Sequence, residues 1–159
     1  MSHLIQIITA QTPQHFSDAK NLIVEYVKWL NLDLSFQNFD QEMADLPKMY
    51  TTNDGGLFIA YLNEAPIGIV GLRRFSEADA EVKRMFVRDE AKGKGVGKLL
   101  LQKCIGIAKA LHYRSIKLDT GAFMKAAIHL YISHGFAEIP AYRFNPHESA
   151  KYYELNLTK

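Results

Sequence analysis

Three glycines at alternate positions stand where a predicted strand passes into a long amphipathic helix. They belong to the run Lys92-Gly93-Lys94-Gly95-Val96-Gly97-Lys98. Glycine allows a backbone to approach a ligand closely, and the free amides at a helix N-terminus attract anions. The lysines add positive charge to the same turn. The segment therefore predicts a site for a pyrophosphate rather than a single carboxylate; the alternative is a tight turn that caps the helix without a ligand.

Two common nucleotide-binding patterns do not match this spacing. A Walker loop, G-x-x-x-x-G-K-[ST], needs a hydroxyl after its lysine, whereas Leu99 follows Lys98, and only three residues separate Gly93 from Gly97. The Rossmann pattern G-x-G-x-x-G belongs to a first βα unit, whereas this run lies late in the chain. The phosphate-binding prediction does not extend to either fold.

Hydrophobic periodicity predicts a sheet flanked by helices. Predicted strands cover residues 4–9, 57–62, 67–75, 81–87, 115–119, 136–139 and 152–157, and predicted helices cover residues 13–30, 38–48, 95–111 and 124–134. In the helix after the glycine run, one apolar stripe contains Val96, Leu99, Leu100, Cys104, Ile107, Ala108 and Leu111. Because strands come first and β-α-β units follow, we expect a mixed, mostly antiparallel sheet with helices on its faces.

The composition favours one domain over residues 1–159. Hydrophobic residues make up 48% of the chain, which is ample for a core at this length. A net charge of +2 gives too weak a basic field for nucleic acid to be the main partner, and no apolar run approaches the roughly 20 residues that span a membrane. The single cysteine, Cys104, cannot form an intramolecular disulfide, and no His or Cys spacing is typical of a metal site. We expect a cytoplasmic protein that binds no metal, nucleic acid or membrane.

The glycine run and a second motif together resemble the GNAT superfamily of N-acetyltransferases. The family's pyrophosphate loop for acyl-coenzyme A follows [QR]-x-x-G-x-[GA], and Lys92-x-x-Gly95-x-Gly97 is similar to it, with lysine in place of Gln or Arg. The run from Ala127 to Phe136 resembles the family pattern A-I-x-L-Y-x-x-x-G-F. The resemblance implies an α/β fold of the GNAT type, with about six to seven strands in the sheet and about four helices around it. It also implies acetyl-CoA as the co-substrate.

The resemblance further implies which residues hold acetyl-CoA. The pyrophosphate would lie on the glycine run, and the pantetheine arm would follow the backbone of the preceding strand. The implied cofactor-binding residues are Met85, Phe86, Val87, Lys92, Gly93, Lys94, Gly95, Val96, Gly97 and Lys98. Met124 stands where the family often has an asparagine that contacts the cofactor, so one polar contact is missing.

Acetyl transfer to an amine needs an acceptor for the ammonium proton and a donor for the departing thiolate. The resemblance makes Tyr131 the general acid, although on the residues alone it is equally a core aromatic. Strand alternation places Glu81 on one face with Met85 and Val87, and the resemblance makes Glu81 the candidate base. A water relay, or a glutamate with no catalytic role, is the alternative. The resemblance assigns the oxyanion to the backbone amide of Met85 or Phe86.

The acceptor site is predicted from three regions of the chain. In the family, the first helices and the loop between them form one wall of this site. In this sequence, Arg73, on the strand before Glu81, and a late loop over residues 142–147 can supply cations and aromatic side chains. The candidate residues are Tyr26, Trp29, Phe36, Arg73, Tyr142 and Arg143. Core packing is the alternative for the aromatic residues of the first helices. Arg73 and Arg143 motivate the hypothesis that the acceptor is a small amine that also carries a carboxylate.

The sequence thus predicts an enzyme that moves the acetyl group of acetyl-CoA to a primary amine of a small molecule, by direct transfer in a ternary complex. Cys104 falls on the buried stripe, so an acyl-cysteine intermediate is not expected. Two alternatives stay open: acetylation of a protein N-terminus or lysine, which predicts an open groove, and a non-catalytic acyl-CoA sensor, which Met124 favours. A monomer and a homodimer paired through edge strands are both compatible with the sequence.

Overall fold

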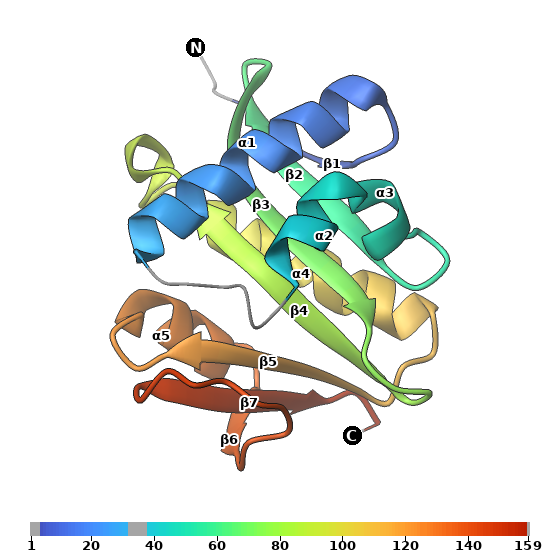
Figure 1. Cartoon of the computed structure of the whole chain (residues 1–159), viewed down its shortest axis with the longest axis vertical. Helices are drawn as coiled ribbons and strands as arrows, with labels where there is room; N and C mark the ends of the chain where they lie inside the picture. The colour runs from blue at the N-terminus through green and yellow to red at the C-terminus, as the bar shows by residue number, and fades with distance from the viewer. Residues whose placement is uncertain (1–3, 32–37, 159) are drawn as a thin grey trace.

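The computed structural model describes residues 4–31 and 38–158, whose strands form one seven-stranded sheet in the order β1-β2-β3-β4-β5-β7-β6 (Figure 1). The strands are β1 Ile5–Thr9, β2 Gly56–Leu62, β3 Ala65–Arg74, β4 Asp79–Val87, β5 Ser115–Gly121, β6 Ala137–Ile139 and β7 Ala150–Asn156. Neighbouring strands are antiparallel except β4 and β5, which are parallel. The predicted mixed, mostly antiparallel sheet is confirmed.

Helices cover both faces of the sheet (Figure 1). They are α1 Pro13–Leu30, α2 Phe39–Ala44, α3 Leu46–Met49, α4 Val96–Ala110 and α5 Lys125–Ser133. α1 and α3 contribute to a core around Leu22 and Ile59 on one face, and α4 and α5 contribute to a core around Leu100 and Ile116 on the other. In the part of the chain that the structure describes, no helix is both long and apolar enough to cross a membrane.

Local sequence explains where the first helices begin. Thr12 Oγ1 accepts a hydrogen bond from His15 N (3.1 Å), and Pro13 occupies the first turn of α1. The single helix predicted over residues 38–48 is instead two helices. Asp45 leaves helical geometry between them, and its carboxylate accepts a hydrogen bond from Lys48 N (3.3 Å) at the start of α3.

The predicted apolar stripe of α4 is wrong at Leu99. This side chain is 38% exposed, whereas Leu101, which the stripe omits, is fully buried. Val96, Leu100 and Cys104 form the centre of the buried stripe, and the residues just before and after Leu100 lie about 100° to either side of it. The helix turns the Leu101 side toward the sheet.

A β-bulge interrupts the alternation of β4. The register of β3 against β4 shifts between Ile69, which pairs with Phe86, and Gly71, which pairs with Lys83. The extra residue falls at Arg84, whose φ is +61°. Non-glycine residues adopt this left-handed backbone only where the surroundings hold it, and bulges of this kind redirect the side chains that follow.

The bulge corrects a prediction about Glu81. Val82, before the bulge, and Met85 and Val87, after it, all pack in the core on the α4 face. Strict alternation would have placed Val82 on the opposite face from Met85. The prediction that Glu81 shares a face with Met85 and Val87 is therefore wrong.

β4 and β5 pair only at one end. Parallel pairs join Asp79–Glu81 to Ser115–Lys117, and the ladder between these two strands stops there. β5 continues along β7 as far as Gly121. From residue 82 onward, the edge of β4 on the β5 side is therefore not paired with β5. Its backbone N–H and C=O groups are available to a ligand.

Candidate active site

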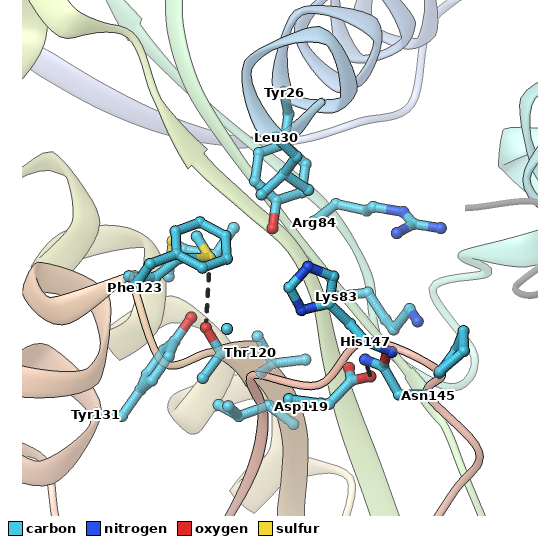
Figure 2. Close-up of a pocket in the computed structure, with 17 residues that line it drawn as sticks. Tyr26, Leu30, Lys83, Arg84, Asp119, Thr120, Phe123, Tyr131, Asn145 and His147 are labelled. Atoms are coloured by element: carbon cyan, nitrogen blue, oxygen red, sulfur yellow. Dashed lines mark hydrogen bonds between the residues drawn. The ribbon is translucent and has the colours of Figure 1, made fainter. Parts of the chain in front are cut away.

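Two adjoining cavities lie where β4 and β5 separate. The larger, about 540 Å³, extends from the end of β4 to the glycine run and the start of α5. The smaller, about 290 Å³, lies between α1, β4, β5 and the segment before β7 (Figure 2). Tyr26, Met85, Phe123 and Met124 line both cavities. A molecule bound in one cavity can therefore meet a molecule bound in the other.

The glycine run forms one end of the larger cavity. Gly93 and Gly95 have φ values of +83° and +78°, and a Cβ at either position would meet no atom within 4 Å. Backbone conformation, rather than crowding, therefore requires glycine at both. At Gly97, a Cβ would lie 3.3 Å from Leu130 Cδ2, so glycine there lets α4 approach α5. Gly95 is the N-cap of α4, whose first amides have no acceptor within the helix, so this backbone cradle fits a pyrophosphate.

The structure brings most of the predicted cofactor residues together. Those that line the larger cavity are Met85, Phe86, Val87, Lys92, Gly93, Gly95, Val96, Gly97 and Lys98. Lys94 is exposed and is not among the described residues that line it. Lys92 Nζ lies 2.9 Å from the carboxylate of Asp89 and 5.4 Å from the centre of the Trp29 ring.

Tyr131 lies on α5 and points into the smaller cavity from the same side as Thr120 (Figure 2). Its side chain is 4% exposed, and its ring contacts Phe136 and Tyr153. Burial raises the pKa of Tyr131 well above its ordinary value, so its phenol keeps its proton at neutral pH. The hydroxyl is thus a proton or hydrogen-bond donor at the cavity.

Met124, which stands where the resemblance led us to expect an asparagine, lines both cavities. The Thr120 hydroxyl donates to Met124 Sδ over 3.5 Å. A thioether is only a weak hydrogen-bond acceptor, so Met124 contributes apolar surface in place of an amide. Polar contacts to a ligand at the start of α5 are then left to backbone groups and to Lys125, which lines the larger cavity.

Glu81 is buried among three partners. Its carboxylate accepts a hydrogen bond from the Tyr142 hydroxyl (2.6 Å), lies 2.9 Å from Arg143 Nε, and lies 3.4 Å from Arg73 Nε. The side chain is completely inaccessible, and Glu81 is not among the described residues that line either cavity. The structure therefore places three predicted site residues, Arg73, Tyr142 and Arg143, around a fourth. Its role as the base stays a prediction.

The remaining acceptor candidates lie at different places in the site. Tyr26 lines both cavities, and burial raises its pKa to about 12. Trp29 lines the larger cavity, beside Lys92, and not the smaller one. Phe36 lies outside the described residues. Of the two acceptor candidates on α1, Tyr26 and Trp29, only Tyr26 reaches the place where the two cavities meet.

Sequence reasoning missed several polar residues of the smaller cavity. They are Lys83, Arg84, Asp119, Thr120 and Asn145. Asp119 ends the run 115–119 that predicted a strand, and Thr120 follows it directly; polar residues at the end of a predicted strand are a signal that could have drawn attention to both. Among the residues that the structure describes, no group of three His, Cys, Asp or Glu side chains is placed to hold a metal ion.

Two buried cations on β4 differ in their environment. Arg84 forms an ion pair with Glu42 of α2, with its Nη2 2.8 Å from Oε1 and its Nε 3.0 Å from Oε2. The Tyr50 hydroxyl also donates to Glu42, over 2.8 Å. Burial opposes the charge of Glu42, but the hydrogen bonds and charge of Arg84 outweigh it and hold the pKa of this carboxyl below its ordinary value. Burial lowers the pKa of Lys83 to about 8, against the attraction of Glu81.

Comparison with known proteins identifies the family. Residues 23–136 match the model of the acetyltransferase (GNAT) family. The chain belongs to the GNAT family of acetyltransferases. It is 33% identical over 157 residues to an uncharacterized N-acetyltransferase of Schizosaccharomyces pombe, covering 98% of this chain and 96% of the relative. The predicted acetyl-CoA-dependent N-acetyltransferase is confirmed.

One solved structure and one further relative are also similar to this chain. The fold matches the PaiA N-acetyltransferase of Thermoplasma acidophilum, solved in complex with coenzyme A, with a TM-score of 0.75, 16% identity, and coverage of 96% of this chain and 99% of the other. The chain is also 37% identical over 100 residues to the N-acetylaspartate synthetase of Xenopus tropicalis. That match covers 62% of this chain and 37% of the relative.

Proposed function

We propose that this N-acetyltransferase acetylates the primary amine of a small molecule by direct transfer in a ternary complex. The observation that carries the proposal is the junction of the two cavities at Tyr26, Met85, Phe123 and Met124, which allows both substrates to be bound at once. Cys104 is fully buried, and burial raises the pKa of its thiol, so it is not suited to carry the acetyl group.

The size of the smaller cavity favours a small acceptor. Its volume of about 290 Å³ is at the lower end of the range for small-molecule sites. Its lining comes from two helices, the three strands β4, β5 and β7, and the segment between β6 and β7, so side chains surround the acceptor on several sides. Acetylation of a protein N-terminus or lysine would instead require a groove that leaves room for the rest of a polypeptide.

The residues at the junction suit acetyl transfer. Acetyl-CoA, when bound, supplies an acetyl group activated as a thioester, and the glycine run with Lys92 and Lys98 would hold its pyrophosphate. The amide of Met85 or Phe86 would stabilise the oxyanion that develops on the acetyl carbonyl. Tyr131, whose phenol stays protonated, would donate a proton to the departing sulfur.

The charges near the smaller cavity favour an acceptor that also carries a carboxylate. Arg73 and Arg143 motivated this hypothesis, but both are engaged with Glu81. The cations that line the cavity are Lys83 and Arg84 of β4, and Arg84 is itself paired with Glu42. The similarity to a relative named N-acetylaspartate synthetase supports the same class of acceptor, since its printed product is an acetylated amino acid with an acidic side chain.

Calorimetric titration with acetyl-CoA, followed by thiol release over a panel of amines, tests the proposal. We expect selective binding of acetyl-CoA over dephospho-CoA and NADH, and release of CoA that depends on a small amine, highest for amines with a carboxylate. Equal rates on amines without a carboxylate would contradict that part of the proposal.

A Tyr131→Phe variant separates an enzyme from a sensor. We expect it to bind acetyl-CoA with unchanged affinity and to lose about 10²–10⁴-fold in kcat, because a general acid contributes on that scale. Acetyl-CoA binding by the wild-type protein without thiol release on any amine would instead identify a sensor.

A further inference from the structure

Two carboxylates lie close to the acceptor end of the site, and their surroundings differ. Glu81 is fully buried and is engaged by two arginines and a tyrosine. Asp119 is half-buried and lines the smaller cavity (Figure 2). Of the described residues that line the two cavities, Asp119 is the one carboxylate. A cationic ligand in the smaller cavity would therefore meet Asp119 and not Glu81.

The partner of Asp119 is an amide whose orientation is fixed. His147 N donates to Asn145 Oδ1 over 3.0 Å, so the Asn145 amide group turns its Nδ2 toward Asp119, where it donates to Oδ2 over 3.1 Å (Figure 2). This neutral donor orients the carboxylate without compensating its charge. A carboxylate has about four lone-pair sites, so the contact with Asn145 leaves acceptor capacity for the N–H groups of a ligand.

We propose that Asp119 binds the ammonium group of the acceptor and takes a proton from it. This inference rests on the proposed function and names the residue that prepares the nucleophile. One N–H proton passes to an Asp119 carboxylate oxygen, and the freed nitrogen lone pair forms the C–N bond to the acetyl carbon. The C–S bond then breaks, its electron pair leaves with sulfur, and sulfur takes the Tyr131 proton. The nitrogen then still carries one proton more than an amide, and this proton passes to the Tyr131 phenolate. The products are an N-acetyl amide and a free thiol, and Asp119 releases its proton to solvent.

The groups around Asp119 agree with this assignment. The titratable residues that face it are Tyr26 of α1, Lys83 of β4, Tyr131 of α5, Tyr152 of β7, and Tyr142 and His147 of the segment between β6 and β7. Burial raises the pKa values of Tyr26 and Tyr131, so both phenols are neutral hydrogen-bond donors near pH 7. Lys83 is the other candidate base, but its protonated form repels an ammonium, whereas the Asp119 carboxylate attracts one.

The test compares Asp119→Asn with two acceptors. One is the best basic amine from the panel, and the other is its fluorinated analogue, whose weak basicity leaves it neutral at pH 7. With the basic amine, we expect Asp119→Asn to lower kcat/KM at pH 7 by about 10²–10⁴-fold, and the loss to shrink as the pH approaches the ammonium pKa. With the fluorinated amine, which needs no deprotonation before it attacks, we expect a loss of about tenfold or less.

Glu81→Gln is the matched control, because it neutralises the neighbouring carboxylate. We expect it to lower kcat/KM equally for the two amines. Calorimetric titration with acetyl-CoA verifies that each variant is folded. Equal losses for both amines in Asp119→Asn would assign Asp119 a structural role and overturn the inference. A loss confined to the basic amine in Glu81→Gln or Lys83→Met, and not in Asp119→Asn, would overturn it in favour of that residue. No activity of the wild-type enzyme on any amine would overturn the proposed function, and the inference with it.

Discussion

The two adjoining cavities are built in different ways. The larger takes its anion-binding end from one continuous segment, residues 92–98, through backbone amides and glycine conformations. The smaller takes its polar groups from side chains on α1, β4, β5, α5 and the segment between β6 and β7. A backbone cradle depends on a local pattern, whereas a side-chain cavity depends on contacts between distant residues and can change without a change of fold. Cofactor binding and acceptor choice should therefore respond to different substitutions.

The largest effect is expected at the buried ion pair behind the acceptor cavity. Glu42→Gln removes the charge that compensates Arg84, whose side chain is 4% exposed. Breaking a buried pair on one side costs about 3–5 kcal/mol of unfolding free energy, which urea denaturation measures. Because Arg84 lines the smaller cavity, we also expect a higher KM for the amine and an unchanged Kd for acetyl-CoA.

Asp54→Asn is the control for this variant. It breaks the exposed pair between Asp54 and Arg74, which lie 3.1 Å apart at the surface. We expect little change in the unfolding free energy or in the KM for the amine. If Glu42→Gln weakened acetyl-CoA binding as much as it raised the KM for the amine, the β4 bulge would couple the two cavities, which contradicts their separate response to substitution.

The fold and the cofactor end were accessible to sequence reasoning because their signals are local. Apolar periodicity places every strand and the three longer helices within a few residues, although it merges α2 and α3, and the glycine run and Tyr131 lie in short motifs. The acceptor end was not accessible in this way. Glu81 meets Tyr142 and Arg143 across 61 and 62 residues of chain, and Asp119 meets Asn145 across 26.

The bulge at Arg84 shows the same limit at a single position. Its place depends on how β3 pairs with β4, which the sequence of β4 alone does not specify. One inserted residue reverses which side chains face α4, so strict alternation predicted the wrong face for Glu81. The composition of β4 does not indicate a bulge, because its residues are compatible with a regular strand.

A smaller effect, dependent on pH, is expected at Lys83. Burial lowers its pKa from 10.5 to about 8, so between these pH values the unfolded chain binds more protons than the folded one. Wild-type stability should therefore gain with rising pH across this window, relative to Lys83→Met, by up to about 1.4 kcal/mol per pH unit. Urea denaturation from pH 7 to pH 10 measures the difference. Lys94→Met, at an exposed position, is the control, and a matching pH dependence there would contradict the assignment to Lys83.

The smallest effect is expected at the cofactor loop, and it should be confined to cofactor binding. Gly95→Ala forces a Cβ into a backbone with φ of +78°. Left-handed backbone costs an L-residue roughly 1–2 kcal/mol, which corresponds to about five- to thirtyfold weaker binding of acetyl-CoA if the loop relaxes to avoid the strain. Gly106→Ala is the matched control, because Gly106 lies inside α4, outside the left-handed region, with no atom within 4 Å of the added Cβ. Calorimetry should find the acetyl-CoA affinity of Gly106→Ala unchanged.

At saturating acetyl-CoA, Gly95→Ala should keep the wild-type KM for the amine, because Gly95 lines the larger cavity and not the smaller one, where the acceptor is proposed to bind. A raised KM for the amine would mean that the glycine loop also shapes the acceptor cavity.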